Sequence, residues 1–152
     1  MNTMTNRTIR QAEQRDVDQL MTLMNQYIDF YESPRPDEQA LRQFINRLQE
    51  NPASGVQFVA EREGRLTGFA TLYFTYSTLQ LKPAAIMNDL FVTAGERGLG
   101  TGEELFQTCL RHVRSNGFAC MTWETAQDNL AAQSFYSKMG GHRSSWLVYE
   151  IS

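Results

Sequence analysis

Residues 98–102 carry glycine at every other position and stand between a strand-like segment and a helix-like one. An apolar run, 86–92, precedes them, and an amphipathic stretch, 103–113, follows. A loop with few side chains exposes backbone N–H groups, and the start of a helix adds partial positive charge, so this arrangement suits an anion. We therefore expect an α/β protein whose glycine loop, with Arg97 at its edge, holds a phosphate-bearing cofactor.

The spacing of these glycines differs from that of the common nucleotide-binding loops. A dinucleotide-binding fingerprint needs Gly-x-Gly-x-x-Gly, and here the third glycine comes one position early. A Walker loop ends in Gly-Lys-Ser/Thr, whereas this loop ends in Gly102-Glu103-Glu104. A glycine loop of this kind is, by itself, also typical of a tight turn before a helix.

A second motif lies about 30 residues downstream, at Asn129, Ala132, Phe135, Tyr136 and Gly140. Together the two segments resemble the GCN5-related N-acetyltransferase (GNAT) superfamily. Its loop reads Arg/Gln-x-x-Gly-x-Gly/Ala, and its later signature reads Asn-x-x-Ala-x-x-Phe-Tyr-x-x-x-Gly. Both motifs occur in the family's order, and the resemblance covers nearly the whole chain.

Composition restricts the remaining function classes. The 152 residues are most simply one domain, 1–152, with a net charge of -3 and no basic cluster, which argues against a nucleic-acid partner. No apolar run approaches the roughly 18 residues of a membrane span, and the polar residues 1–6 lack the apolar core of a signal peptide. Cys109 and Cys120 are expected to be buried free thiols, which fits a cytoplasmic protein. No metal site is indicated.

Hydrophobic periodicity predicts alternating secondary-structure elements. We expect helices at 16–32, 41–48, 101–116 and 129–139, and strands at 7–12, 56–60, 66–74, 85–92, 118–125 and 146–151. The early strands form an antiparallel meander, and the strand–helix–strand unit that follows brings 85–92 and 118–125 side by side and parallel. The predicted fold is therefore a GNAT-type mixed, mostly antiparallel sheet flanked by helices, with the cofactor cleft at the parallel pair.

The resemblance implies acetyl-CoA as the cofactor. It places the pyrophosphate on the glycine loop and the pantetheine arm along the backbone of the preceding strand, as an added strand would bind. The implied cofactor-binding residues are Leu90, Phe91, Val92, Arg97, Gly98, Leu99, Gly100, Thr101, Gly102, Glu103, Asn129 and Tyr136. Asn129 has an equal alternative as the N-cap of its helix.

Acetyl transfer to an amine needs a general acid and a neutral amine. The resemblance assigns the acid to Tyr136, whose phenol stays protonated at neutral pH. For the base, Asp89 and Glu124 are both candidates, because each is expected near the cleft. A solvated or capping carboxylate is the alternative for both.

The acceptor side is predicted from the first helix and the strands around the cleft. Aromatic rings and carboxylates suit a cationic amine, and the predicted substrate-binding residues are Tyr27, Tyr31, Glu32, Asp89 and Trp123. Any one of these aromatics could instead belong to the core. Segments 75–83 and 88–92 resemble the diamine (polyamine) acetyltransferase branch, but Asn88 replaces the first acid of the Glu-Asp pair common there. A monoamine, an amino acid or an analogue is thus at least as well supported.

The sequence therefore predicts an N-acetyltransferase that moves an acetyl group from acetyl-CoA to the primary amine of a small molecule, by direct attack in a ternary complex. A non-catalytic acyl-CoA-binding sensor and a protein-lysine or N-terminal acetyltransferase on the same fold are the alternatives, as is a protein-interaction domain without a cofactor. The last strand and the aromatic-rich edges favour a homodimer.

Overall fold

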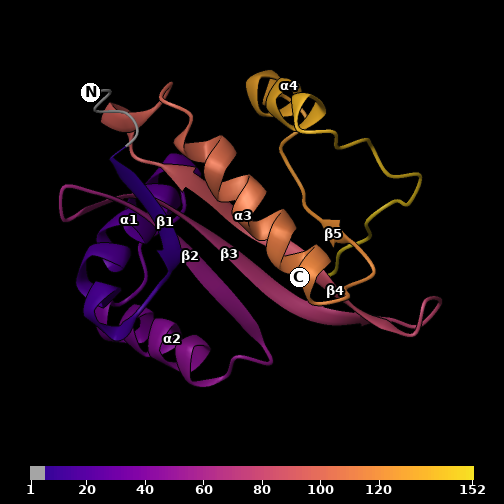
Figure 1. Ribbon diagram of the computed structural model, residues 1–152, viewed down its shortest axis with the longest axis horizontal. Coiled ribbons are helices and arrows are strands. Elements are labelled where there is room, and N and C mark those ends of the chain that lie inside the picture. Colours follow the sequence, from indigo (N-terminus) through magenta and orange to yellow (C-terminus); the bar gives the residue numbers. More distant parts are fainter. Residues whose placement is uncertain (1–5) are drawn as a thin grey trace.

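A five-stranded sheet in the order β1-β2-β3-β4-β5 forms the centre of the computed structural model, which describes residues 6–152 (Figure 1). The strands are β1 (Arg7–Gln11), β2 (Gly55–Arg62), β3 (Arg65–Ser77), β4 (Lys82–Val92) and β5 (Met121–Thr122). β1 to β4 pair antiparallel, and β5 pairs parallel with β4. The predicted mixed, mostly antiparallel sheet is confirmed.

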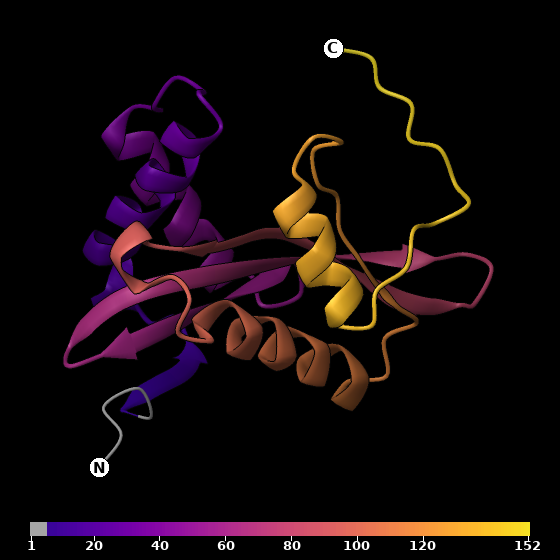
Figure 2. The same ribbon diagram turned by 90° about the horizontal axis from the view of Figure 1, so that it is seen from above.

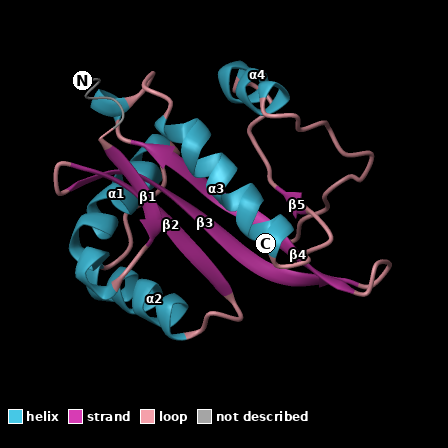
Figure 3. Ribbon diagram, viewed as in Figure 1, coloured by secondary structure: helices cyan, strands magenta, loops and turns pink. Residues whose placement is uncertain are grey.

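Residues 6–152 form four α-helices (Figure 3). They are α1 (Val17–Phe30), α2 (Glu38–Glu50), α3 (Thr101–Ser115) and α4 (Leu130–Lys138), with single 3-10 turns at Gln14–Asp16 and Ala94–Glu96. Figure 2 shows α1 and α2 on one side of the sheet and α3 on the other. None of the helices within residues 6–152 has the length and apolar character that a membrane crossing requires.

Each face of the sheet has its own hydrophobic core. On β3, Phe69 packs with residues of α1 and α2, whereas Ala70 and Leu72 pack with residues of α3. Side chains on a strand alternate between faces, so one continuous apolar run can serve both cores. This explains why 66–74 is mostly apolar and does not alternate regularly between apolar and polar residues.

An extra residue in β4 interrupts this alternation. Thr71 of β3 pairs with Asp89, but Leu72 pairs with Met87, which leaves Asn88 unmatched in a β-bulge. Before the bulge Met87 faces the α3 core; after it Leu90 faces that core, and Phe91 faces α1 and α2. The bulge therefore turns Asp89 toward the α1–α2 side of the sheet.

Two predicted strands are corrected. The strand predicted at 118–125 pairs only at Met121–Thr122, opposite Ala85 and Ile86, because β4 bends at the bulge just beyond that point. The strand predicted at 146–151 is wrong for the chain as described: these residues pair with no strand within 6–152 and are exposed. Alternating apolar residues alone do not make a strand without a neighbouring one.

The prediction of two buried thiols is half right. Cys109 is fully buried in the α3 core, and burial raises the pKa of its thiol to about 12. Cys120 is exposed, directly before β5. It lies at the sheet edge, which no other strand within residues 6–152 covers.

Candidate active site

The glycine loop makes a left-handed turn into α3. Gly98 has φ +80° and Gly100 has φ +85°, a region that side chains other than glycine's rarely enter. Gly100 is the N-cap of α3. At Gly102 an added Cβ would make only ordinary contact, 3.8 Å from a Val92 methyl group. The backbone conformation therefore explains glycine at 98 and 100. Gly102 leaves the first turn of α3 without a side chain, so that a ligand can approach its backbone closely.

Arg97 joins this loop to the end of β4. Its Nε donates to the carbonyl oxygen of Val92 over 2.8 Å. The guanidinium carbon lies 5.4 Å from the ring centre of Phe91 and 5.7 Å from that of Phe30, as in cation–π contacts. The predicted loop cation is thus held over the strand that leads into the loop.

The backbone of β4 beyond the bulge has an edge that β5 does not cover. The N–H of Thr93 donates to the carbonyl of Thr67 on β3 over 2.9 Å. Hydrogen-bonded pairs alternate along an antiparallel ladder, so the N–H and C=O groups of Leu90 and Val92 point away from β3. The pairing of β4 with β5 ends at Ile86. This edge can accept an extended ligand chain as an added strand would bind.

A second cation beside the loop comes from the start of the chain. Arg7 of β1 donates to both carboxylate oxygens of Glu104, at 3.1 and 2.9 Å, and its side chain is 7 % exposed. A Cβ on Gly100 would lie 3.6 Å from one of its nitrogens. Arg7 therefore anchors the first turn of α3. Sequence reasoning missed it, because 97 residues separate it from its partner.

The predicted acid lies on the α3 face. Tyr136 of α4 is half-buried, with its ring centre 5.3 Å from that of Trp123 and 6.4 Å from that of Phe106. Burial raises the pKa of Tyr136, and the neighbouring phenol of Tyr31 adds to this effect. Asn129 caps α4, its side-chain oxygen accepting from the N–H of Ala132 over 3.1 Å. The N-cap alternative for Asn129 is therefore confirmed.

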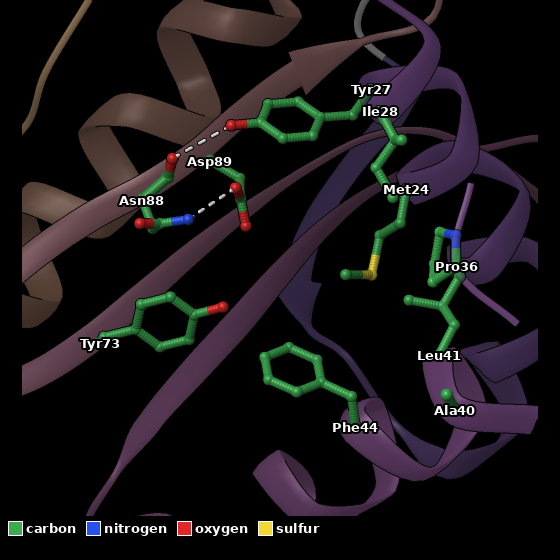
Figure 4. Close-up of a pocket in the computed structure, with 10 residues that line it drawn as sticks. All are labelled: Met24, Tyr27, Ile28, Pro36, Ala40, Leu41, Phe44, Tyr73, Asn88 and Asp89. Atoms are coloured by element: carbon green, nitrogen blue, oxygen red, sulfur yellow. Dashed lines mark hydrogen bonds between the residues drawn. The ribbon is translucent and has the colours of Figure 1, made fainter. Parts of the chain in front are cut away.

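Asp89 lies in a cavity of about 370 Å³ on the opposite face, between α1, α2, β3 and β4 (Figure 4). The cavity is lined by Met24, Tyr27, Ile28, Pro36, Ala40, Leu41, Phe44, Tyr73, Asn88 and Asp89. Asp89 is 6 % exposed, and one of its oxygens accepts from the side-chain amide of Asn88 over 3.0 Å. Figure 4 shows its carboxylate and the Tyr73 hydroxyl directed toward the same space.

The charge of Asp89 acts on the two tyrosines of this cavity. Burial, and then the Asp89 carboxylate, raises the pKa of Tyr73 to about 12. The pKa of Tyr27 is also raised, by burial first and the Asp89 charge second. The Tyr27 hydroxyl donates to the carbonyl oxygen of Asn88 over 3.3 Å and so ties α1 to the bulge. Both phenols remain protonated donors at neutral pH.

The other predicted acceptor residues lie outside this cavity. Tyr31 is 53 % exposed at the end of α1, and Trp123 packs on the α3 face. Glu32, with φ +54°, closes α1: its N–H donates to Asp29 and that of Ser33 to Ile28, the bonds of a Schellman cap. Glu124, the rival base, is exposed after β5.

Sequence reasoning missed the wall that α2 contributes. Ala40, Leu41 and Phe44 line the cavity, although their helical spacing indicated only a core-facing helix. Phe44 is 42 % exposed, which is more than a core position would allow. Only the packing of α2 against α1 and β3 brings it beside Asp89, so no signal in the local sequence could have found it.

The comparisons with known proteins agree with this geometry. The profile of the Acetyltransferase (GNAT) family matches residues 20–141, from α1 through the end of α4. The chain belongs to this family. It is 35% identical over 141 residues, 93% of each chain, to the uncharacterized N-acetyltransferase YhfO of Bacillus subtilis (strain 168). It is therefore an acetyl-CoA-dependent N-acetyltransferase of the GNAT type.

Solved structures of GNAT proteins share the fold. A probable acetyltransferase superposes with a TM-score of 0.87 at 28% identity, over 95% of this chain and 97% of that one. An aminoglycoside acetyltransferase from an uncultured soil metagenomic sample, in complex with trehalose, superposes with a TM-score of 0.80 at 20% identity. This match covers 97% of this chain and 96% of that one. The second likeness concerns the fold alone, so the acceptor has to be argued from this chain's own cavity.

Proposed function

We propose that this GNAT enzyme acetylates the primary amine of a small molecule with one cationic nitrogen and an apolar body. The observation that carries the proposal is a single buried carboxylate, Asp89, in a mostly apolar cavity. Among the residues that line the cavity, Asp89 is the one acidic side chain. A buried carboxylate is stable when a cation pairs with it, and an ammonium group supplies that cation.

The dimensions of the cavity narrow the substrate class. Its volume of about 370 Å³ lies at the lower end of ordinary ligand pockets. At about 30 Å³ for a water-sized group it has room for roughly a dozen such groups. Met24, Leu41 and Phe44 supply apolar walls opposite the carboxylate. An arylalkylamine or a branched alkylamine fits this description, whereas a polyamine would place its second charge against apolar walls.

The cofactor side has the features that coenzyme A needs. The proposed holding residues are the loop 98–102 with its left-handed glycines, the start of α3, and the backbone edge at Leu90 and Val92 that β5 leaves uncovered. When bound, acetyl-CoA supplies the activated acetyl thioester. Helix dipole and loop amides favour its phosphates, and the Leu90 backbone favours its amide arm.

Asp89 and Tyr136 approach this edge from opposite faces of the sheet. Asp89 lies on the α1–α2 side, and Tyr136 lies on the α3 side. The Tyr31 phenol raises the pKa of Tyr27, which lines the Asp89 cavity, and also that of Tyr136. We assign the ammonium and its proton to the Asp89 carboxylate. Tyr136 Oη keeps its proton until it donates it to the leaving group.

Glu124 remains the second candidate for the base. It is exposed, so water could carry a proton between it and the cleft. A buried carboxylate that lines the acceptor cavity is better placed to hold the ammonium. The pH profiles of Asp89→Asn and Glu124→Gln distinguish the two.

The test is an amine panel assayed by thiol release from acetyl-CoA. We expect phenylethylamine and isoamylamine to have a kcat/KM at least tenfold above those of spermidine and of an N-terminal peptide. Phe44→Ala should lower kcat/KM for the apolar amines several-fold through KM, because it removes one wall. Leu79→Ala is the control, since Leu79 is 88 % exposed between β3 and β4 and does not line the cavity. A preference for spermidine or the peptide would contradict the proposal.

A further inference from the structure

Two arginines stand opposite each other at the end of the β1–β2 pair. Arg7 of β1 and Arg62 of β2 are direct partners in the antiparallel register, so their side chains lie on the same face of the sheet. Ile9 and Ala60, the next pair on that face, belong to the α3 core. Like charges directly opposite each other destabilise a sheet, so each arginine needs a carboxylate of its own.

The two carboxylates that pair with them flank the glycine loop. Arg62 donates to the Glu96 carboxylate over 3.2 Å, just before the loop, and Arg7 donates to both oxygens of Glu104, just after it. The Arg7 side chain is almost fully buried and that of Arg62 is 26 % exposed, so neither guanidinium is freely solvated. The loop 98–102 is thus tied, before and after, to one point of the β1–β2 ladder.

These ion pairs also set the charge around the loop. Glu96 and Glu104 each lie two residues from the loop 98–102, and an unpaired carboxylate there would repel the phosphates of coenzyme A. The guanidinium groups cancel both charges. Arg7 lies against the loop itself, because a Cβ on Gly100 would come 3.6 Å from one of its nitrogens.

We propose that Arg7 and Arg62 are positioning residues for acetyl-CoA. They fix both ends of the glycine loop, and they cancel the negative charge of Glu104 and Glu96 beside the phosphates. Both arginines act through these carboxylates and not by a contact with the cofactor. A loop that is ordered before binding loses less conformational entropy on binding, which raises affinity. The inference rests on the proposed placement of the pyrophosphate at this loop, so its test includes a variant of the loop.

Calorimetric titration with acetyl-CoA tests the two arginines. Arg7→Gln should raise the Kd about tenfold or more, because Glu104 is left as an uncompensated charge beside the phosphates. Adding Glu104→Gln to this variant should restore most of the affinity, since that charge is then removed. Arg7→Lys keeps the charge and should bind within about threefold of the wild type. Arg62→Gln repeats the test at the more exposed pair and should raise the Kd about threefold, with the fold retained.

Arg42→Gln is the matched control. Arg42 of α2 pairs with Asp18 of α1 over 2.7 Å, on the opposite side of the sheet from α3. The substitution changes the net charge by the same amount as Arg7→Gln and should leave the Kd for acetyl-CoA unchanged. In steady-state kinetics Arg7→Gln should raise KM for acetyl-CoA, while kcat and KM for the amine stay within about twofold. A purely structural role would not produce this split.

Gly100→Asp separates a failure of this inference from a failure of the cofactor site. If Gly100→Asp loses acetyl-CoA binding while Arg7→Gln binds like the wild type, the proposal is overturned and the cofactor site stands. A double variant, Arg7→Gln with Glu104→Gln, that binds no better than Arg7→Gln alone would also overturn it, because no charge was being compensated. If Gly100→Asp itself binds normally, the phosphates bind elsewhere, and both proposals are wrong.

Discussion

The two ligand sites of this enzyme are built from different parts of the chain. The proposed cofactor site consists mainly of backbone, in the loop 98–102 and along the end of β4. The proposed acceptor cavity consists mainly of side chains, brought together from α1, α2, β3 and β4. Backbone recognition needs a short local motif with glycine at fixed places, whereas a side-chain cavity needs tertiary packing. A single sequence can therefore indicate the cofactor site, whereas the acceptor site becomes visible only in the folded structure.

The largest effect is expected where the backbone does the binding. Gly100→Asp should lower acetyl-CoA affinity more than 100-fold, because a carboxylate then stands where the phosphates bind. Gly64→Asp is the matched control: Gly64 has φ +77° and open surroundings, but lies in the β2–β3 turn. Calorimetric titration and thermal unfolding of both variants separate lost binding from strain. Equal affinity losses would show that strain alone is responsible.

The second-largest effect is expected on kcat, when the proposed general acid Tyr136 is changed. Tyr136→Phe should lower kcat by about 10²-fold, the usual scale for a lost general acid, with little change in acetyl-CoA affinity. Steady-state kinetics across pH with the best amine of the panel measures it. Tyr76→Phe is the control, because Tyr76 is 82 % exposed on β3. A kcat within twofold of the wild type would remove Tyr136 from the mechanism.

In the acceptor cavity, removing the charge of Asp89 should raise KM for the amine more than removing the Phe44 ring does. Asp89→Asn should raise KM for the apolar amines about tenfold or more, because the ammonium loses its buried partner. Acetyl-CoA affinity should stay the same, since Asp89 faces the other side of the sheet. If Glu124→Gln produces this change and Asp89→Asn does not, the acceptor binds outside the cavity.

Most of the fold and the turn of the glycine loop could be predicted from the sequence, because the features that form them are local. The glycines at 98 and 100, the Asn129 cap and the long apolar run of β3 each act within a few residues of themselves. The acceptor cavity could not be read, because Phe44 and Tyr73 acquire their role only through packing. Arg7 was missed for the same reason. The strand at 146–151 was predicted from alternating apolar residues, but such a segment forms a strand only when a neighbouring strand pairs with it.

The smallest expected effect is a change in the pKa of Tyr73 when Asp89 loses its charge. The pKa of Tyr73 is raised to about 12 by burial and by the charge of Asp89. Asp89→Asn removes the second cause, so the pKa of Tyr73 should fall but stay above about 10, since burial remains. Alkaline difference spectra of the two proteins, each compared with its Tyr73→Phe version, measure this shift. An unchanged Tyr73 titration would mean that the two groups do not interact.

The single unmatched residue at Asn88 has an evolutionary consequence. Beyond it, every side chain of β4 lies on the face opposite to the one that uninterrupted alternation would give. A descendant that kept Asn88 but paired it in a regular ladder would move Asp89 to the α3 side and Leu90 into the proposed acceptor cavity, whereas one that lost Asn88 would leave both on their present faces. Loss of the bulge with its residue retained would therefore erase the proposed acceptor site in one step, while substitutions around the cavity could change its specificity gradually.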